Sequence, residues 1–90
     1  LILIEQNKYP AALKCLERGN FYAEKLKNPY RLGVINRIMA QIRSQMDTNR
    51  TMQQVFNHFL VHPVEYYTNE ARKYFQQTNS KYEMEAVFKI

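Results

Sequence analysis

Two histidines are the side chains whose spacing first suggests chemistry. His58 and His62 are four residues apart, and on a helix that spacing places both imidazoles on one face, where they could chelate a metal ion. A zinc site needs further ligands, and the one thiol of the chain, Cys15, is distant in sequence. No glutamate stands between the histidines as in a metalloprotease helix. We therefore expect no metal site and interpret both histidines as half-exposed residues beside an apolar helix face.

The remaining reactive groups form no catalytic pattern. Cys15 lies between Leu13 and Leu16 with no histidine placed to activate it, so we interpret it as a small core residue. The two glycines, Gly19 and Gly33, are isolated and cannot form a phosphate-binding loop. The acidic residues occur singly, at positions expected to face solvent, and no two of them form a pair suited to acid–base catalysis. The sequence thus predicts a non-catalytic protein without a cofactor.

Positive charge is concentrated in one segment, Lys25–Arg50. It holds six basic residues against one acid, Asp47, and so carries the whole formal net charge of +5. The basic residues are Lys25, Lys27, Arg31, Arg37, Arg43 and Arg50. Basic helices attract phosphates, which makes nucleic-acid binding the alternative function. Arginines six residues apart nevertheless point to different sides of a helix, so they form no single row.

Aromatic side chains favour a different function. The chain has seven tyrosines and five phenylalanines. Tyr66 points away from the apolar stripe of its helix, and exposed tyrosines are typical of protein interfaces. Tyr67 and Tyr30 are further interface candidates. We therefore predict a module for protein–protein interaction or assembly, whose partner is another protein chain or further domains of the same protein.

The elements that must position these residues are helices, because glycine and proline number only two and three. Apolar spacing predicts helices over Pro10–Lys27 and Pro29–Met46, the second capped by Asn28. A third helix should begin with a capping box at Thr51–Gln54 and end at Pro63, which also opens a fourth. The first helix could instead break at Gly19, but this glycine lies on the apolar stripe, which favours continuity. The expected core places Phe56, Phe59 and Leu60 against Ile35, Ile38 and Ile42, with Asn36 on the polar side of its helix.

The two ends of the chain are harder to interpret. Ser80–Glu83 fits a capping box, which favours a helix, yet the side chains of Lys81–Ile90 alternate in polarity, and we predict a strand. Leu1–Ile4, which is either a short strand or the end of a helix, or another chain would supply its partner. The expected fold is therefore mainly α, a compact single domain of about four helices over residues 1–90, with short terminal strands. Apolar ends predict a fragment of a longer chain. A lone cysteine and the absence of an apolar run of about 20 residues predict an intracellular location, cytoplasmic or nuclear, and no membrane partner.

Overall fold

The computed structural model describes residues 7–79 and Glu83, and the described part is helical. Its four helices are α2 (Tyr9–Lys25), α3 (Pro29–Met46), α4 (Arg50–Phe56) and α5 (Val64–Gln77). Residues 7–79 contain no strand. The expected mainly α bundle is confirmed, and α2 is continuous through Gly19. The strands predicted at Leu1–Ile4 and Lys81–Ile90 lie outside the described residues, except that Glu83 is described and is helical instead of extended.

The turn between α2 and α3 is encoded by two residues. Lys27 adopts a left-handed conformation with φ of 50°. Its N–H donates to the carbonyl of Glu24 at 3.1 Å, and the Asn28 N–H donates to that of Ala23 at 3.1 Å. These are the two hydrogen bonds of a Schellman ending. The Asn28 side chain then accepts from the Arg31 N–H at 3.1 Å and begins α3 as predicted.

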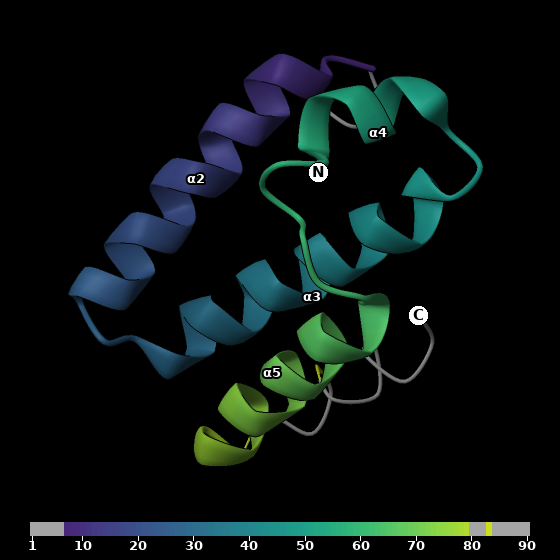
Figure 1. Cartoon of the computed structure of the whole chain (residues 1–90). Coiled ribbons are helices and arrows are strands. Elements are labelled where there is room, and N and C mark those ends of the chain that lie inside the picture. The colour runs from purple at the N-terminus through teal and green to yellow at the C-terminus, as the bar shows by residue number, and fades with distance from the viewer. Residues whose placement is uncertain (1–6, 80–82, 84–90) are drawn as a thin grey trace.

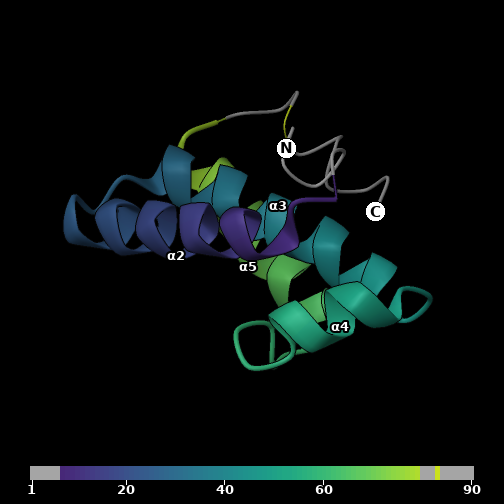
Figure 2. The ribbon, with the colours of Figure 1, turned by 90° about the horizontal axis from the view of Figure 1, so that it is seen from above.

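Helix α3 is the element on which the others are assembled (Figure 1). Both α2 and α5 pack on α3, and the α3–α5 contact is the most extensive between described helices. Helix α4 contacts α2 and α3 near the start of α2 and the end of α3 (Figure 2). Helices α2 and α5 approach α3 from two sides, and residues of all three helices line a trough between α2 and α5.

The main core lies where all four helices meet. Phe56 of α4 is fully buried, and its ring meets the Tyr9 ring of α2 edge to face with centroids 6.4 Å apart. A smaller cluster joins Ala71 and Phe75 of α5 to Val34 of α3. The buried residues of the main core are Tyr9, Ala12, Leu16, Met39, Ala40, Ile42, Met46, Met52, Phe56, Leu60 and Tyr67.

Gly33 allows the close packing of α3 on α5. A Cβ atom at this position would lie 2.7 to 3.0 Å from three atoms of the Phe75 ring. Phe75 is fully buried, so its ring has little room to move. Gly19 is the corresponding small residue between α2 and α3, but its Cβ would meet only the end of the Ile35 side chain, at 3.3 Å.

The boundaries of α4 differ from the sequence-based prediction. Asn49, not Thr51, caps the helix, because its side chain accepts from the Met52 N–H at 3.1 Å. The helix ends at Phe56 instead of continuing to Pro63. After Phe56 the chain turns, with the Leu60 N–H donating to the Phe56 carbonyl at 2.8 Å. This turn buries Leu60 and carries the chain across α3 to α5.

Three predictions about burial are also wrong. Asn36 is only 7% exposed, and the nitrogen of its side-chain amide donates to the Leu32 carbonyl at 2.8 Å, so this donor is paired inside the protein. Cys15 is exposed on α2, since the helix turns it away from the buried Ala12 and Leu16. Phe59 is only half-buried at the edge of the core, and so are Ile35 and Ile38. Phe56, Leu60 and Ile42 are buried as expected.

Candidate functional site

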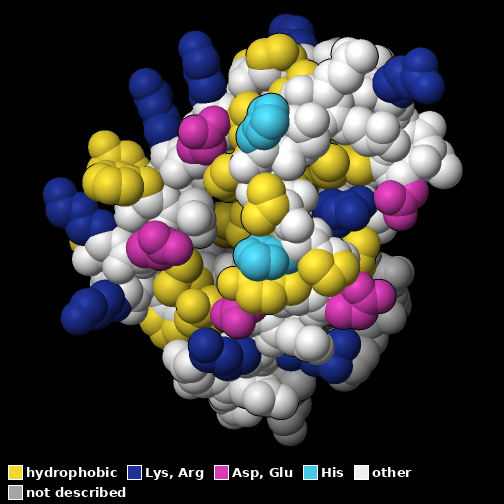
Figure 3. All heavy atoms as spheres, viewed as in Figure 1, with side chains coloured by type: hydrophobic (Ala, Val, Ile, Leu, Met, Phe, Trp, Pro, Cys, Tyr) yellow, Lys and Arg dark blue, Asp and Glu magenta, His cyan; other side chains and the backbone are white. Residues whose placement is uncertain are grey.

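The trough between α2 and α5 holds a pocket of about 210 Å³, which we call the inter-helix pocket. Its floor comes from α3, its two sides from α2 and α5, and its remaining edge from the segment that joins α4 to α5. Figure 3 shows this face of the molecule, where acidic, histidine and hydrophobic side chains are interspersed with lysine and arginine side chains. The lining residues are Asn20, Glu24, Leu32, Asn36, Met39, Phe59, Val61, His62, Tyr66, Tyr67, Glu70 and Tyr74.

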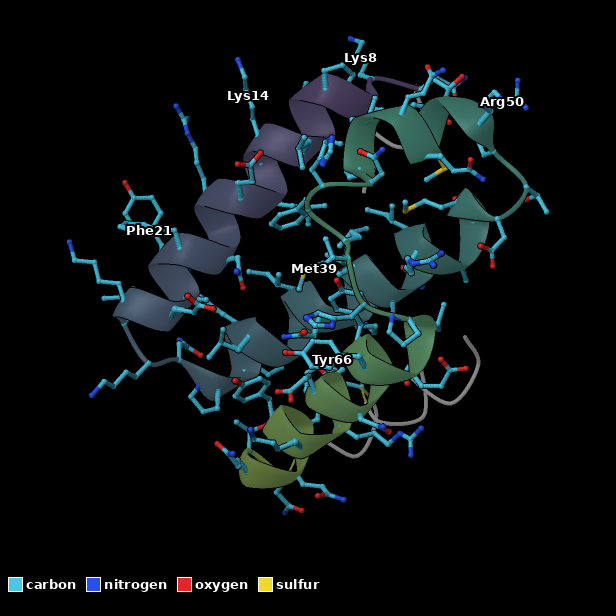
Figure 4. All side chains as sticks on the ribbon, viewed as in Figure 1. Lys8, Lys14, Phe21, Met39, Arg50 and Tyr66 are labelled. Atoms are coloured by element: carbon cyan, nitrogen blue, oxygen red, sulfur yellow. The ribbon has the colours of Figure 1, made fainter. Side chains whose placement is uncertain are left out.

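A cluster of three rings forms one edge of the inter-helix pocket. The His62 ring stacks on the Tyr66 ring with centroids 4.0 Å apart and an interplanar angle of 28°. Tyr67 meets both edge to face, at 6.0 Å from His62 and 5.2 Å from Tyr66. Arg43 fixes the backbone here, because its Nε–H donates to the His62 carbonyl at 3.1 Å. Figure 4 shows Tyr66 on α5 and Met39 on α3 beneath this region.

Tyr67 is the buried ring of this cluster. Burial raises the pKa of Tyr67 above its ordinary value, and this effect exceeds the opposing hydrogen bond from the backbone of His62. That hydrogen bond runs from the His62 N–H to the Tyr67 hydroxyl at 3.3 Å. Tyr67 is 4% exposed, because it lies on the apolar stripe of α5 and faces the core.

The charge of the inter-helix pocket is opposite to that of the whole chain. Glu24 of α2 and Glu70 of α5 line it, and none of its lining residues is lysine or arginine. Glu70 Oε2 lies 3.6 Å from the ammonium of Lys73, whose side chain is 58% exposed. The same ammonium lies 5.3 Å from the centroid of the Tyr74 ring. Two of the lining residues, Glu70 and Tyr74, therefore already lie beside a cation.

A second surface lies at the end of the molecule where α2 joins α3. Phe21, Tyr22, Leu26 and Tyr30 are 60%, 55%, 66% and 44% exposed, and we call these four residues the apolar patch. Phe21 lies on the outer side of α2, away from α5 (Figure 4). Its ring is 5.6 Å from that of Tyr22. The other three residues line a shallow groove of about 440 Å³ together with Gly19, Arg31, Val34 and Ile35.

Sequence-based reasoning identified only Tyr30 of this apolar patch. Phe21 and Tyr22 fall off the stripe formed by Ala12, Leu16, Gly19 and Ala23, and that position is the signal that could have predicted their exposure. Leu26 lies at the edge of the stripe, as the C-cap residue of α2, and is 66% exposed. Tyr30 donates its hydroxyl to Glu83 at 2.9 Å, and this hydrogen bond to a carboxylate raises the pKa of Tyr30.

Five of the six basic candidates lie near one or the other end of α3. Lys25, Lys27 and Arg31 are exposed beside the apolar patch. Arg43 lies about 18 Å from Arg31 along the helix axis, at 1.5 Å per helical residue. It forms a salt bridge with Asp47 at 3.1 Å and donates a hydrogen bond to the His62 carbonyl. Arg50 begins α4 at the far end (Figure 4).

Arg37 completes the set of basic candidates. It is half-buried, and its buried Nε has no hydrogen-bond partner among the described residues. The structure therefore does not bring the six residues of Lys25–Arg50 into one surface.

The histidine spacing does not produce a chelating face. His58 lies in the turn after α4 and His62 in the segment before α5, so neither belongs to a helix. Within residues 7–79 and Glu83, no group of three His, Cys, Asp or Glu side chains could hold a metal ion. No helix in this part of the chain is both long enough and apolar enough to cross a membrane. Comparison with protein families, curated proteins and solved structures finds no match to this chain.

Proposed function

We propose that this chain is a protein-binding module that uses the apolar patch as its contact surface. The observation that carries the proposal is that Phe21, Tyr22, Leu26 and Tyr30 are all largely exposed at one end of the molecule. Scattered surface apolar residues need no explanation, but large aromatic and aliphatic side chains gathered around a groove mark contact surfaces. Tyrosine in particular anchors many protein interfaces.

The charge beside the apolar patch indicates the chemistry of the partner. Arg31 lines the groove, and Lys25 and Lys27 are exposed on the turn that borders it. A complementary segment would insert apolar side chains between Tyr22 and Tyr30 and place carboxylates against these three cations. The proposed partner is therefore an acidic amphipathic segment, carried by another protein or by a further part of the same protein.

Selection of peptides from a random display library on the immobilised chain tests this proposal. We expect enrichment of peptides that combine leucine or aromatic residues with aspartate or glutamate. In titrations, Leu26→Asp should weaken the binding of the best peptide at least tenfold. The new carboxylate places a charge in an apolar contact and repels the carboxylates of the partner. Gln41→Asp is the matched control, since Gln41 is exposed on α3 outside the groove and the charge change is the same.

Enrichment of basic peptides, or equal binding by the Leu26→Asp and Gln41→Asp variants, would contradict the proposal. Duplex DNA is the probe for the alternative function. Nucleic-acid binding predicts tight association that weakens steeply with salt and is lost when Arg37 and Arg43 are changed to Gln. That result would replace a protein partner with nucleic acid as the ligand of Lys25–Arg50.

A further inference from the structure

We propose that the inter-helix pocket binds an organic cation, an ammonium or guanidinium group carried on a short apolar stem. This site is separate from the apolar patch: the two share no residue. The proposal rests on the charge of the pocket, on the rings that surround it, and on the lysine at its rim.

The charge of the pocket selects a cation. The chain carries a net charge of +5, yet two carboxylates and no basic side chain line this pocket. Glu24 is contributed by α2 and Glu70 by α5, so the carboxylates come from opposite sides of the trough. A concave surface concentrates such a field and favours ligands of the opposite sign.

The rings of the pocket select an organic cation over a metal ion. Five rings line it, those of Phe59, His62, Tyr66, Tyr67 and Tyr74. An ammonium or guanidinium within about 6 Å of an aromatic ring centroid is attracted by the ring quadrupole. Guanidinium groups also stack flat on such rings, whereas a hard metal ion requires several oxygen ligands.

The floor of the pocket offers apolar surface for the stem of the ligand and a polar group that could orient its cation. Leu32 and Met39 are 8% and 6% exposed and present apolar surface. Asn36 lies in the same floor at 7% exposed and uses its amide nitrogen on the Leu32 carbonyl. Its side-chain oxygen accepts no hydrogen bond from the described residues, so it remains available for a donor group of the ligand.

The ammonium of Lys73 lies beside two of the residues that line the pocket, Glu70 and Tyr74. This ammonium is held by Glu70 at 3.6 Å and by the Tyr74 ring at 5.3 Å, on an exposed side chain that a stronger ligand can displace. The pocket volume of about 210 Å³ is below the range of about 300–1,000 Å³ that holds drug-sized molecules. The ligand is therefore the size of one amino-acid side chain or a small amine.

Titrations monitored by ¹H–¹⁵N NMR test the proposal with four probes: butylammonium, butylguanidinium, neutral 1-butanol and a blocked glycyl-arginyl-glycine peptide. Both cations should shift the Asn36 side-chain amide and backbone resonances of Tyr66 and Glu70, and 1-butanol should not. Tighter binding of the peptide than of butylguanidinium would identify the cation as a side chain of a partner protein. Equal or tighter binding of the free cations would show that a small amine is sufficient.

Two substitutions with opposite expected effects separate this site from a general surface effect. Glu70→Gln should weaken the binding of butylguanidinium about fivefold. This is the scale of one charge-assisted hydrogen bond at a partly exposed site. Lys73→Gln should strengthen the binding of butylguanidinium, because the substitution removes the competing ammonium. Glu17→Gln is the matched control, since Glu17 is exposed on α2 and does not line the pocket.

Three results would overturn the proposal: equal binding of 1-butanol, equal affinities of the Glu70→Gln and Glu17→Gln variants, or no gain from Lys73→Gln.

Discussion

The contact between Gly33 and Phe75 allows the packing of α3 on α5 to be tested with a matched pair of substitutions. Alanine is favoured over glycine within a helix by about 1 kcal/mol, so Gly33→Ala and Gly19→Ala gain the same intrinsic propensity. At Gly33 the new methyl group would lie 2.7 to 3.0 Å from three ring atoms of fully buried Phe75. Overpacking of this kind costs about 1–3 kcal/mol, and a rigid buried ring places the cost near the upper end. We therefore expect Gly33→Ala to destabilise the fold by about 2 kcal/mol.

At Gly19 the expected sign is reversed. The new methyl group would meet only Cδ1 of Ile35 closely, at 3.3 Å, and Ile35 is half-buried, so the end of its side chain can rotate away. The propensity gain should then exceed the packing cost, and we expect a small stabilisation of about 0.5 kcal/mol.

Urea unfolding followed by circular dichroism measures both changes through the midpoint and slope. A Phe75→Leu background should remove most of the Gly33→Ala penalty, because the double-mutant cycle isolates the contact with the ring. The reasoning is refuted if Gly33→Ala is as stable as Gly19→Ala, or if its penalty is unchanged in the Phe75→Leu background.

Three further predictions follow from single residues. Lys27→Gly should stabilise the fold by about 0.5–1 kcal/mol in thermal melts, because φ of 50° strains a residue that has a Cβ. Phe56→Ala should cost about 3–5 kcal/mol in urea unfolding and clearly more than Phe59→Ala, since Phe56 is fully buried and Phe59 only half-buried. Tyr67 holds its proton to higher pH when folded, because burial raises its pKa. Above about pH 10 the unfolded chain therefore loses this proton first, and stability should fall with pH more steeply in the wild type than in Tyr67→Phe, as unfolding series at pH 8 to 11 would show.

The helical class and the α2–α3 boundary could be predicted because their signals are local. Asn28 and Pro29 act through the backbone of their own first turn, and the stripe containing Gly19 extends through the length of α2. The beginning of α4 was missed because two capping patterns compete within three residues. Asn49 prevails, since its side chain also donates to the hydroxyl of Tyr9 at 3.3 Å, a contact across 40 positions that local sequence does not reveal.

The candidate sites depend even more on tertiary structure. The inter-helix pocket joins residues of α2, α3, α5 and the segment before α5, and no spacing in the sequence places Glu24 near Glu70. Burial of Asn36 was missed because hydrophobic patterning assigns every amide to the polar side, whereas here the amide nitrogen donates to the backbone of its own helix. The exposed Phe21 and Tyr22 carried a usable signal, since a residue off the apolar stripe of a helix tends to face solvent.

The two proposed binding surfaces use opposite sides of α2, and this makes their tests independent. Asn20 and Glu24 line the inter-helix pocket, whereas Tyr22 and Leu26 line the groove of the apolar patch. The two residues of each pair are four positions apart and therefore lie on one face of the helix. The second pair is offset from the first by two residues, so its face is rotated by about 200° around the helix axis. Substitutions at Leu26 and Glu70 share no contact, so their effects on the two ligands should not couple. A Leu26→Asp variant that loses its peptide should still bind butylguanidinium, and Glu70→Gln should still bind the peptide. If either variant lost both ligands, the two surfaces would have to be parts of one site or the variant would have to be unfolded, and its circular dichroism spectrum would distinguish these cases.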